Sequence, residues 1–105
     1  MAIGAVGVVG VATHWTGPEH QTMMLAIEKG ELEEARRINA QLQKSFLYES
    51  SAEAPNPIPA KVMMELIGFR VGRGRPPMDS VPDGLRNLAL QVLAETEIGK
   101  NIDPD

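Results

Sequence analysis

The 105-residue chain contains no cysteine. This excludes a disulfide framework, a thiolate nucleophile and cysteine metal ligands, and it fits a reducing compartment. Positive charge is also scarce, because ten lysines and arginines against fourteen acidic residues give a formal net charge of −4. A nucleic-acid partner would favour a basic stripe. We therefore expect no nucleic acid among the partners of this protein.

The chain also lacks a long hydrophobic run. Its apolar beginning, residues 1–12, is shorter than the about 20 apolar residues of a membrane-spanning helix, and it has no basic residues in front of it as a secretory signal would. We expect a cytoplasmic protein without a membrane partner. Its length suits one domain, and its six methionines replace some of the bulk that so few aromatic residues provide.

A second β-strand is missing as well. Ala5 to Ala12 is a continuous apolar run rich in valine, which predicts a strand buried on both faces, as in parallel sheets covered by helices. No other strand pattern follows, and a lone strand leaves its backbone N–H and C=O groups unpaired. We therefore expect this strand to pair with another chain or with sequence not present here.

Four helices are predicted after the strand, over residues 18–29, 31–50, 57–67 and from a cap at Asp79 or Ser80 to Gly99. Apolar residues three and four apart indicate the buried stripe of each helix. The stripes are Met23, Met24 and Ile27; Leu32, Ala35, Ile38, Leu42 and Phe46; Ile58, Val62, Met63 and Leu66; and Val81, Leu85, Leu88 and Val92. The chain as it stands is therefore mostly α-helical.

The stiffest stretch is the proline corner, residues 54–61, which reads Ala-Pro-Asn-Pro-Ile-Pro-Ala-Lys. Each proline fixes φ near −65° and restricts the residue before it. We expect Asn56 to cap the third helix, Pro57 to be its first residue, and Gly68 to end it in the left-handed conformation. The proline corner is thus a rigid lead into a helix.

Motifs for phosphate or metal binding are weak. Gly4, Gly7 and Gly10 lie within the apolar run, and no Lys-Ser/Thr pair follows them as in a phosphate loop. His14 and His20 are six residues apart, which matches neither a helical pair nor a zinc signature. We expect no metal site and no cofactor. Polar residues at the end of the strand, such as Thr13 and His14, can instead line the mouth of a pocket.

No lysine fits a Schiff-base role, because such an amine must be desolvated to lose its proton near neutral pH. Lys29, Lys44, Lys61 and Lys100 lie at helix ends, on a charged face or beside the core face of the third helix. Three arginines form a local basic patch, Arg70, Arg73 and Arg75. A solvated loop is the favoured interpretation of this patch, and a site for an anion or an acidic partner is the alternative.

Four segments occur in one order that resembles the 4-hydroxy-tetrahydrodipicolinate synthase (dihydrodipicolinate synthase) family. They are the glycine- and valine-rich residues 4–11, the Glu-Ala-Arg-Arg-Ile-Asn stretch at 34–39, the Pro-Asn-Pro-Ile-Pro-Ala-Lys stretch at 55–61, and Arg-Pro-Pro-Met at 75–78. The resemblance covers nearly the whole chain and corresponds to the C-terminal third of the family. Asn-Pro-Ile-Pro followed by Lys is its most specific part and favours the synthase over related pyruvate-dependent lyases.

The resemblance implies a (β/α)₈ barrel, the TIM fold, followed by a helical extension. Residues 1–30 would then be the last βα unit of the barrel, and residues 31–105 the C-terminal helical extension. The family is a class I aldolase-type lyase that joins pyruvate, held as a Schiff base on a lysine, to aspartate semialdehyde in lysine biosynthesis. Its complete form is expected to be a homotetramer.

The resemblance carries two substrate-binding positions over to this chain. Val9 matches the residue of the last barrel strand whose backbone lies against pyruvate, and Asn56 matches an asparagine near the pocket for the second substrate. The lysine and the tyrosine relay of the family do not fall within these residues, so we expect no catalytic residue in this chain and no turnover by it alone. The alternative hypothesis is a stand-alone helical module for interaction or oligomerisation, without catalysis.

Overall fold

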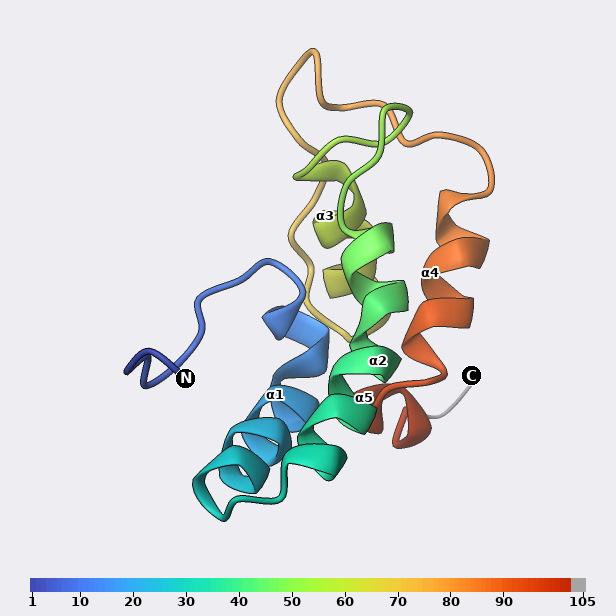
Figure 1. The fold of residues 1–105 in the computed structure, drawn as a ribbon. Coiled ribbons are helices and arrows are strands. Elements are labelled where there is room, and N and C mark those ends of the chain that lie inside the picture. The colour runs from blue at the N-terminus through green and yellow to red at the C-terminus, as the bar shows by residue number, and fades with distance from the viewer. Residues whose placement is uncertain (103–105) are drawn as a thin grey trace.

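Five helices follow one another in the computed structural model, which describes residues 1–102. They are α1 (Thr13–Glu28), α2 (Leu32–Tyr48), α3 (Ile58–Leu66), α4 (Leu85–Leu93) and α5 (Glu97–Lys100). The pair α1 and α2 forms a helical hairpin, α3 packs on α4, and α5 returns to α1 (Figure 1). The last three residues of the predicted helical extension, 103–105, lie outside the described residues.

The predicted strand at residues 5–12 does not form. Within residues 1–102 the structure has no strand, so this segment finds no neighbour with which to exchange the backbone hydrogen bonds of a sheet. Instead, it extends away from the helices as an irregular chain on one side of the molecule (Figure 1). Its first three valines are exposed, with Val6 94% and Val9 104% exposed, and Val11 is half-buried against the core. We call residues 4–12 the valine segment.

Helix α1 begins at Thr13, five residues before the predicted start at Pro18. The proline remains inside the helix and lacks the N–H that would bond one turn back, so the helix kinks. The kink is at Thr16, whose φ and ψ are −120° and 18°. Its hydroxyl donates to the Ala12 carbonyl at 2.7 Å. The sequence therefore predicted the part of α1 after the kink and missed the turn before it.

The core centres on Trp15 and Tyr48, whose rings meet edge to face with centroids 5.9 Å apart. Trp15 is fully buried, and its indole N–H donates to the Ser45 hydroxyl on α2 at 3.1 Å. Buried side chains of α3 and α4 complete this cluster, among them Ile58, Val62, Met63, Leu85, Ala89, Val92 and Leu93. Helices α1, α2, α3 and α4 therefore share one core.

The predicted stripes of α1, α2 and α4 need correction. On α1, Met23, Met24 and Ile27 are only half-buried, and the buried positions are Trp15, Thr16, His20 and Ala26. On α2, Leu32 is exposed and Phe46 half-buried, while Ser45 and Tyr48 take the buried positions. Val81 lies before α4 and is exposed, as is Leu88 on the helix, while Ala89 and Leu93 are buried with Leu85 and Val92. The stripe of α3 is confirmed for Ile58, Val62 and Met63, with Leu66 half-buried.

Two predicted caps are also wrong. Asn56 does not cap α3, because Pro57 occupies the cap position and the Ile58 N–H donates to the Pro55 carbonyl at 3.0 Å. Neither Asp79 nor Ser80 caps α4, which begins after Gly84. Gly68 does follow α3 with a positive φ of 98°, as predicted.

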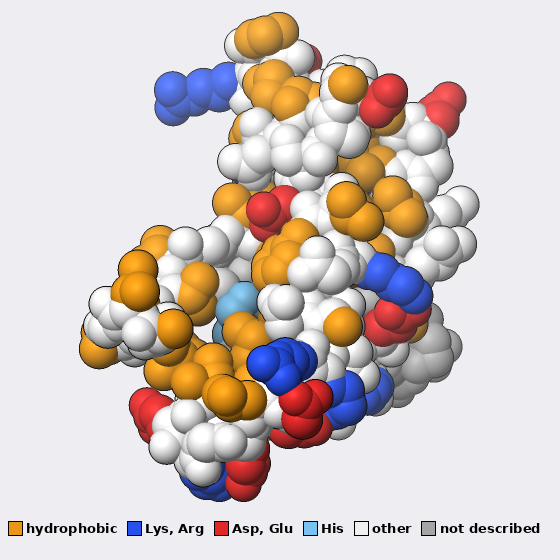
Figure 2. Space-filling view, in the orientation of Figure 1, with side chains coloured by type: hydrophobic (Ala, Val, Ile, Leu, Met, Phe, Trp, Pro, Cys, Tyr) orange, Lys and Arg blue, Asp and Glu red, His pale blue; other side chains and the backbone are white. Residues whose placement is uncertain are grey.

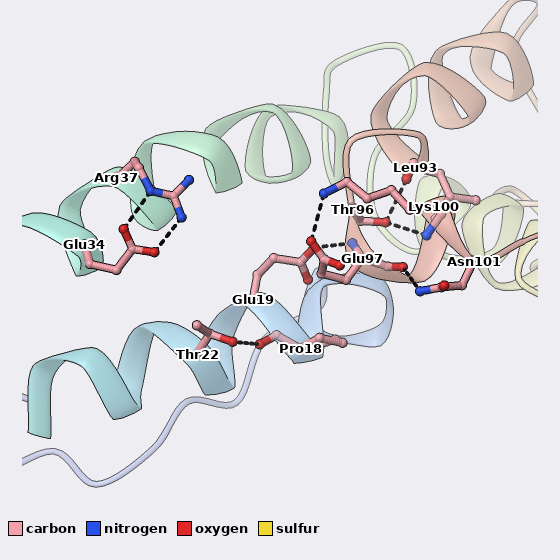
Figure 3. Close-up of polar contacts among 11 residues, drawn as sticks. Pro18, Glu19, Thr22, Glu34, Arg37, Leu93, Thr96, Glu97, Lys100 and Asn101 are labelled. Atoms are coloured by element: carbon pink, nitrogen blue, oxygen red, sulfur yellow. Dashed lines mark hydrogen bonds and ion pairs between the residues drawn. The ribbon is translucent and has the colours of Figure 1, made fainter. Parts of the chain in front are cut away.

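Helix α5 ties the end of the chain to α1. The Glu97 N–H donates to the Glu19 carboxylate at 2.6 Å, and Lys100 pairs with the Glu97 side chain at 2.8 Å (Figure 3). The Thr96 hydroxyl accepts the Gly99 N–H at 2.9 Å and so caps this one-turn helix. The predicted fourth helix, which was expected to run on to Gly99, is thus two elements with a turn between them.

The molecule exposes more surface than its size requires. Its accessible area is 7160 Å², whereas a monomeric protein of this mass exposes about 5,800 Å². Its radius of gyration, 14.8 Å, likewise exceeds the about 13 Å of a compact chain of this length. The extended valine segment contributes directly to this excess. Among the described residues, no helix has both the length and the apolar character needed to span a bilayer.

Candidate functional site

The segments that carry the two predicted binding positions, Val9 and Asn56, are anchored in the same hydrophobic core. The Ala12 N–H donates to the Glu49 carboxylate at 3.1 Å, so the end of the valine segment is fixed to the end of α2. Ala12 and Ala54 are only 2% and 3% exposed, and both belong to the cluster around Tyr48. The valine segment and the proline corner are therefore both anchored in the same core.

This anchoring limits how far apart the two positions can be. Val9 is three residues from Ala12 and Asn56 two from Ala54, which places their Cα atoms within about 11 Å and about 8 Å of those anchors. Both residues are exposed. Both positions thus lie within a few residues of the shared core, and both are exposed to solvent.

The backbone around Asn56 is tightly determined. Asn56 lies between Pro55 and Pro57, which restrict the backbone on both sides, and its N–H donates to the Ser50 hydroxyl at 3.4 Å. Within residues 1–102 the Asn56 carboxamide has no hydrogen-bond partner. A carboxamide offers two donors and an acceptor. Asn56 is therefore an amide held on a rigid support and available to a ligand.

Thr13 and His14, predicted to line a pocket mouth, turn back on the chain instead. The Thr13 hydroxyl donates to the Gly10 carbonyl, and His14 Nδ1 contacts the Val11 carbonyl at 2.7 Å. Both side chains thus satisfy carbonyl groups that a neighbouring strand would otherwise bind. In this structure they secure the junction between the valine segment and α1.

The other titratable candidates have structural partners. Burial raises the pKa of Tyr48, whose hydroxyl donates to the Pro59 carbonyl at 2.8 Å. His20 is buried, with Nδ1 2.9 Å from the Thr16 carbonyl and its ring against Phe46. Both groups are committed to the packing of the helices.

The lysines are exposed or only half-buried. Lys44 and Lys100 form exposed ion pairs with Glu95 and Glu97, and Lys61 donates to the Val71 carbonyl at 3.2 Å. None has the desolvated surroundings that lower the pKa of a Schiff-base lysine. In the described part of the chain, no three histidine or acidic side chains come together as metal ligands.

One residue at this place was missed by the sequence reasoning. Glu49 holds the Ala12 N–H across 37 positions of the chain. No local pattern marks it, because a glutamate at the end of a helix resembles any solvated charge. Its role follows only from the packing that brings α1 beside the end of α2.

Comparisons with known proteins agree on one family. The family model described as "Dihydrodipicolinate synthetase family" matches residues 1–95. The 4-hydroxy-tetrahydrodipicolinate synthase of Parasynechococcus marenigrum (strain WH8102) is 38% identical over 94 residues, covering 90% of this chain and 30% of the relative. The synthase of Prochlorococcus marinus (strain MIT 9515) is 41% identical over 93 residues, with 89% and 30% covered.

The chain therefore spans about 30% of the length of the curated relatives that it matches. No solved structure matches it significantly. The similarity extends from the valine segment through the proline corner to the end of α4, and so includes both Val9 and Asn56.

Proposed function

Because this chain belongs to the dihydrodipicolinate synthetase family, we propose that it acts as the C-terminal part of a 4-hydroxy-tetrahydrodipicolinate synthase. The fold class of the family is the (β/α)₈ barrel, and the chain corresponds to its C-terminal portion, helical as it stands. The proposed activity is that of a lyase that condenses pyruvate with aspartate semialdehyde. The match over residues 1–95 is the observation that carries the proposal.

The exposed valine segment supports the proposal physically. An apolar chain with unpaired backbone groups gains both burial and hydrogen bonds when it joins a parallel sheet. Beside it, hydrophobic side chains gather toward the lower ends of α1 and α2 (Figure 2). They border a hollow of about 440 Å³ lined in part by Met23, Ile27 and Leu32. We propose that residues 1–30 are the last βα unit of the barrel, residues 31–105 its helical extension, and this apolar face the one that the barrel covers.

In the proposed reaction the amine of a lysine attacks the pyruvate carbonyl and water leaves, which gives a Schiff base. Loss of a methyl proton forms the enamine, whose carbon then attacks the aldehyde. The lysine is supplied by barrel strands outside these residues, so this chain contributes binding groups. The Val9 backbone would lie against pyruvate, and the Asn56 carboxamide would reach the second substrate from its rigid support. We also propose, in line with the same family assignment, that the complete enzyme is homo-oligomeric and cytoplasmic.

The test is reconstitution. The 105-residue chain is mixed with a polypeptide comprising the first two-thirds of the Parasynechococcus marenigrum synthase, and turnover of pyruvate and aspartate semialdehyde is measured. We expect activity only from the mixture, with borohydride and pyruvate adding mass to the longer polypeptide. In the active mixture, Asn56→Ala should raise the KM for aspartate semialdehyde and leave pyruvate trapping intact.

A matched pair of variants controls for sheet pairing. Val6→Lys places a charge in the valine segment, whereas Leu47→Lys places one on an equally solvent-facing position of α2, where the native side chains are 94% and 78% exposed. Reconstitution should fail for Val6→Lys and survive for Leu47→Lys. Turnover and borohydride labelling of the 105-residue chain alone would refute the proposal. A folded oligomer of the chain that never associates with the longer polypeptide would instead support an interaction module.

A further inference from the structure

A cavity of about 260 Å³ lies between α3 and residues 68–84, the connector that leads to α4. We call it the connector cavity. The buried side chains of Ile58 and Val62 form its α3 wall, and Met78 and Val81 form the wall on the connector. The volume equals about nine water molecules at about 30 Å³ each. The connector cavity therefore has apolar side chains on both walls and room for a small organic molecule.

The connector wall is fixed by local contacts. A Cβ at Gly74 would lie 2.3 Å from the Met78 carbonyl oxygen, so only glycine allows this turn. The Met78 N–H donates to the Arg75 carbonyl at 2.7 Å. Lys61 reaches across from α3 to the Val71 carbonyl at 3.2 Å. These contacts hold the connector against α3 and keep the cavity open between them.

Charged side chains surround the cavity without neutralising one another. Lys61, Arg73 and Arg86 line it, as do Glu65 and Asp79. Among residues 1–102, none of these five side chains takes part in an ion pair. The lining therefore has an excess of one positive charge, and its two guanidinium groups are available for a carboxylate, which they can bind through two parallel hydrogen bonds.

We propose that the connector cavity binds a small organic monocarboxylate with an apolar body. The carboxylate would pair with Arg73 and Arg86, while the body would lie against Ile58, Val62 and Met78. Glu65 and Asp79 disfavour a second negative charge on the ligand. This inference rests on the cavity alone and does not depend on the synthase activity. Of the basic patch predicted at Arg70, Arg73 and Arg75, the proposed anion site keeps Arg73 and adds Arg86.

The experiment is an NMR titration of the 105-residue chain, following the backbone amides. The probes are hexanoate, hexylamine, which has the same body and opposite charge, and inorganic phosphate. We expect saturable shifts around the connector cavity with hexanoate and much weaker ones with the other two probes. Arg73→Gln and Arg86→Gln should each weaken hexanoate binding about five- to tenfold, since each removes a charge-assisted pair.

Two further variants make the outcome decisive. Arg70→Gln removes an equal charge from the same connector at a residue that does not line the cavity, and it should leave hexanoate affinity unchanged. Gly74→Ala disturbs the wall without removing a charge and should weaken hexanoate binding, with circular dichroism reporting that the helices persist. Equal binding of hexylamine, phosphate as tight as hexanoate, no saturable shift, or equal losses in Arg70→Gln and Arg73→Gln would each overturn the proposal.

Discussion

Two buried side-chain hydrogen bonds connect the elements that form the core of this protein. The Trp15 indole bonds to Ser45, and the Tyr48 hydroxyl bonds to the Pro59 carbonyl in the proline corner. Leaving such a buried partner unsatisfied costs about 1 to 3 kcal/mol. These two bonds therefore specify how α1, α2 and the proline corner meet.

We predict that Tyr48→Phe lowers the free energy of unfolding by about 1 kcal/mol at pH 8, because the Pro59 carbonyl loses its donor. Burial raises the pKa of Tyr48 above its ordinary value of 10.0, so the unfolded chain loses this proton first as the pH rises. The stabilisation is present below pH 10 and declines above it, by up to about 1.4 kcal/mol per pH unit. Urea unfolding at pH 8 and pH 11 measures both effects.

Comparing the native protein with the phenylalanine variant controls for the other groups that titrate in this pH range. Lys100, whose hydrogen bond to Glu97 raises its pKa, titrates in both proteins, so only the difference between them reports on Tyr48. The advantage of the native protein over the variant should shrink between the two pH values. A constant difference would show that the hydroxyl ionises equally well in the folded state.

At this scale the sequence predicts residue types better than residue partners. Trp15 and Tyr48 are large and amphipathic, which suits a core with hydrogen bonds, but nothing local pairs Trp15 with Ser45 or Ala12 with Glu49 across 30 and 37 positions. The candidate positions Val9 and Asn56 came from a resemblance to a family, and the structure adds the anchor that they share.

Among the elements, those with the clearest apolar period were the most predictable. Helices α2 and α3 lie within about two residues of their predicted bounds. Helix α1 was predicted from Pro18 onward, because a proline at the first position of a helix is more common than one beyond a kink. Helix α4 was predicted too long, because a turn closed by Thr96 interrupts the apolar pattern. The boundaries thus failed where side-chain contacts override local preference.

We predict that Thr96→Val lowers the free energy of unfolding by about 1 kcal/mol, because its hydroxyl accepts the Gly99 N–H and donates to the buried Leu93 carbonyl at 2.7 Å. Thr96→Ser, which keeps the hydroxyl, is the matched control and should lose much less. Urea unfolding of the three proteins checks this. Equal losses in the two variants would show that the hydroxyl does not account for the stabilisation.

For the whole molecule, the fold class and the mostly α-helical character of the chain were predicted correctly, whereas the strand predicted at residues 5–12 does not form. The family and its barrel follow from the order of the motifs, and the comparisons confirm both. The predicted strand requires neighbours that residues 1–102 do not supply, so the structure shows an exposed chain instead. The exposed valine segment accounts for part of the extra surface of the molecule.

The contact between α5 and α1 brings two distant parts of the sequence together and so closes the chain into a ring. The Glu97 N–H and the Glu19 carboxylate are 78 positions apart, whereas the α1–α2 hairpin closes over residues 29–31. The entropy lost on closing a loop grows with its length, and local contacts form sooner than distant ones. We expect the hairpin to form early in folding and the ring to close late.

This order makes a kinetic prediction. Glu19→Ala, which opens the ring, should raise the unfolding rate several-fold and leave the folding rate nearly unchanged, whereas Ile38→Val in the hairpin should mainly slow folding. Stopped-flow urea kinetics distinguishes the two. Slower folding of Glu19→Ala would place ring closure before the rate-limiting barrier. We therefore expect the hydrogen bond between the Glu97 N–H and Glu19 to set the lifetime of the folded molecule, through its unfolding rate, and to have little effect on its folding rate.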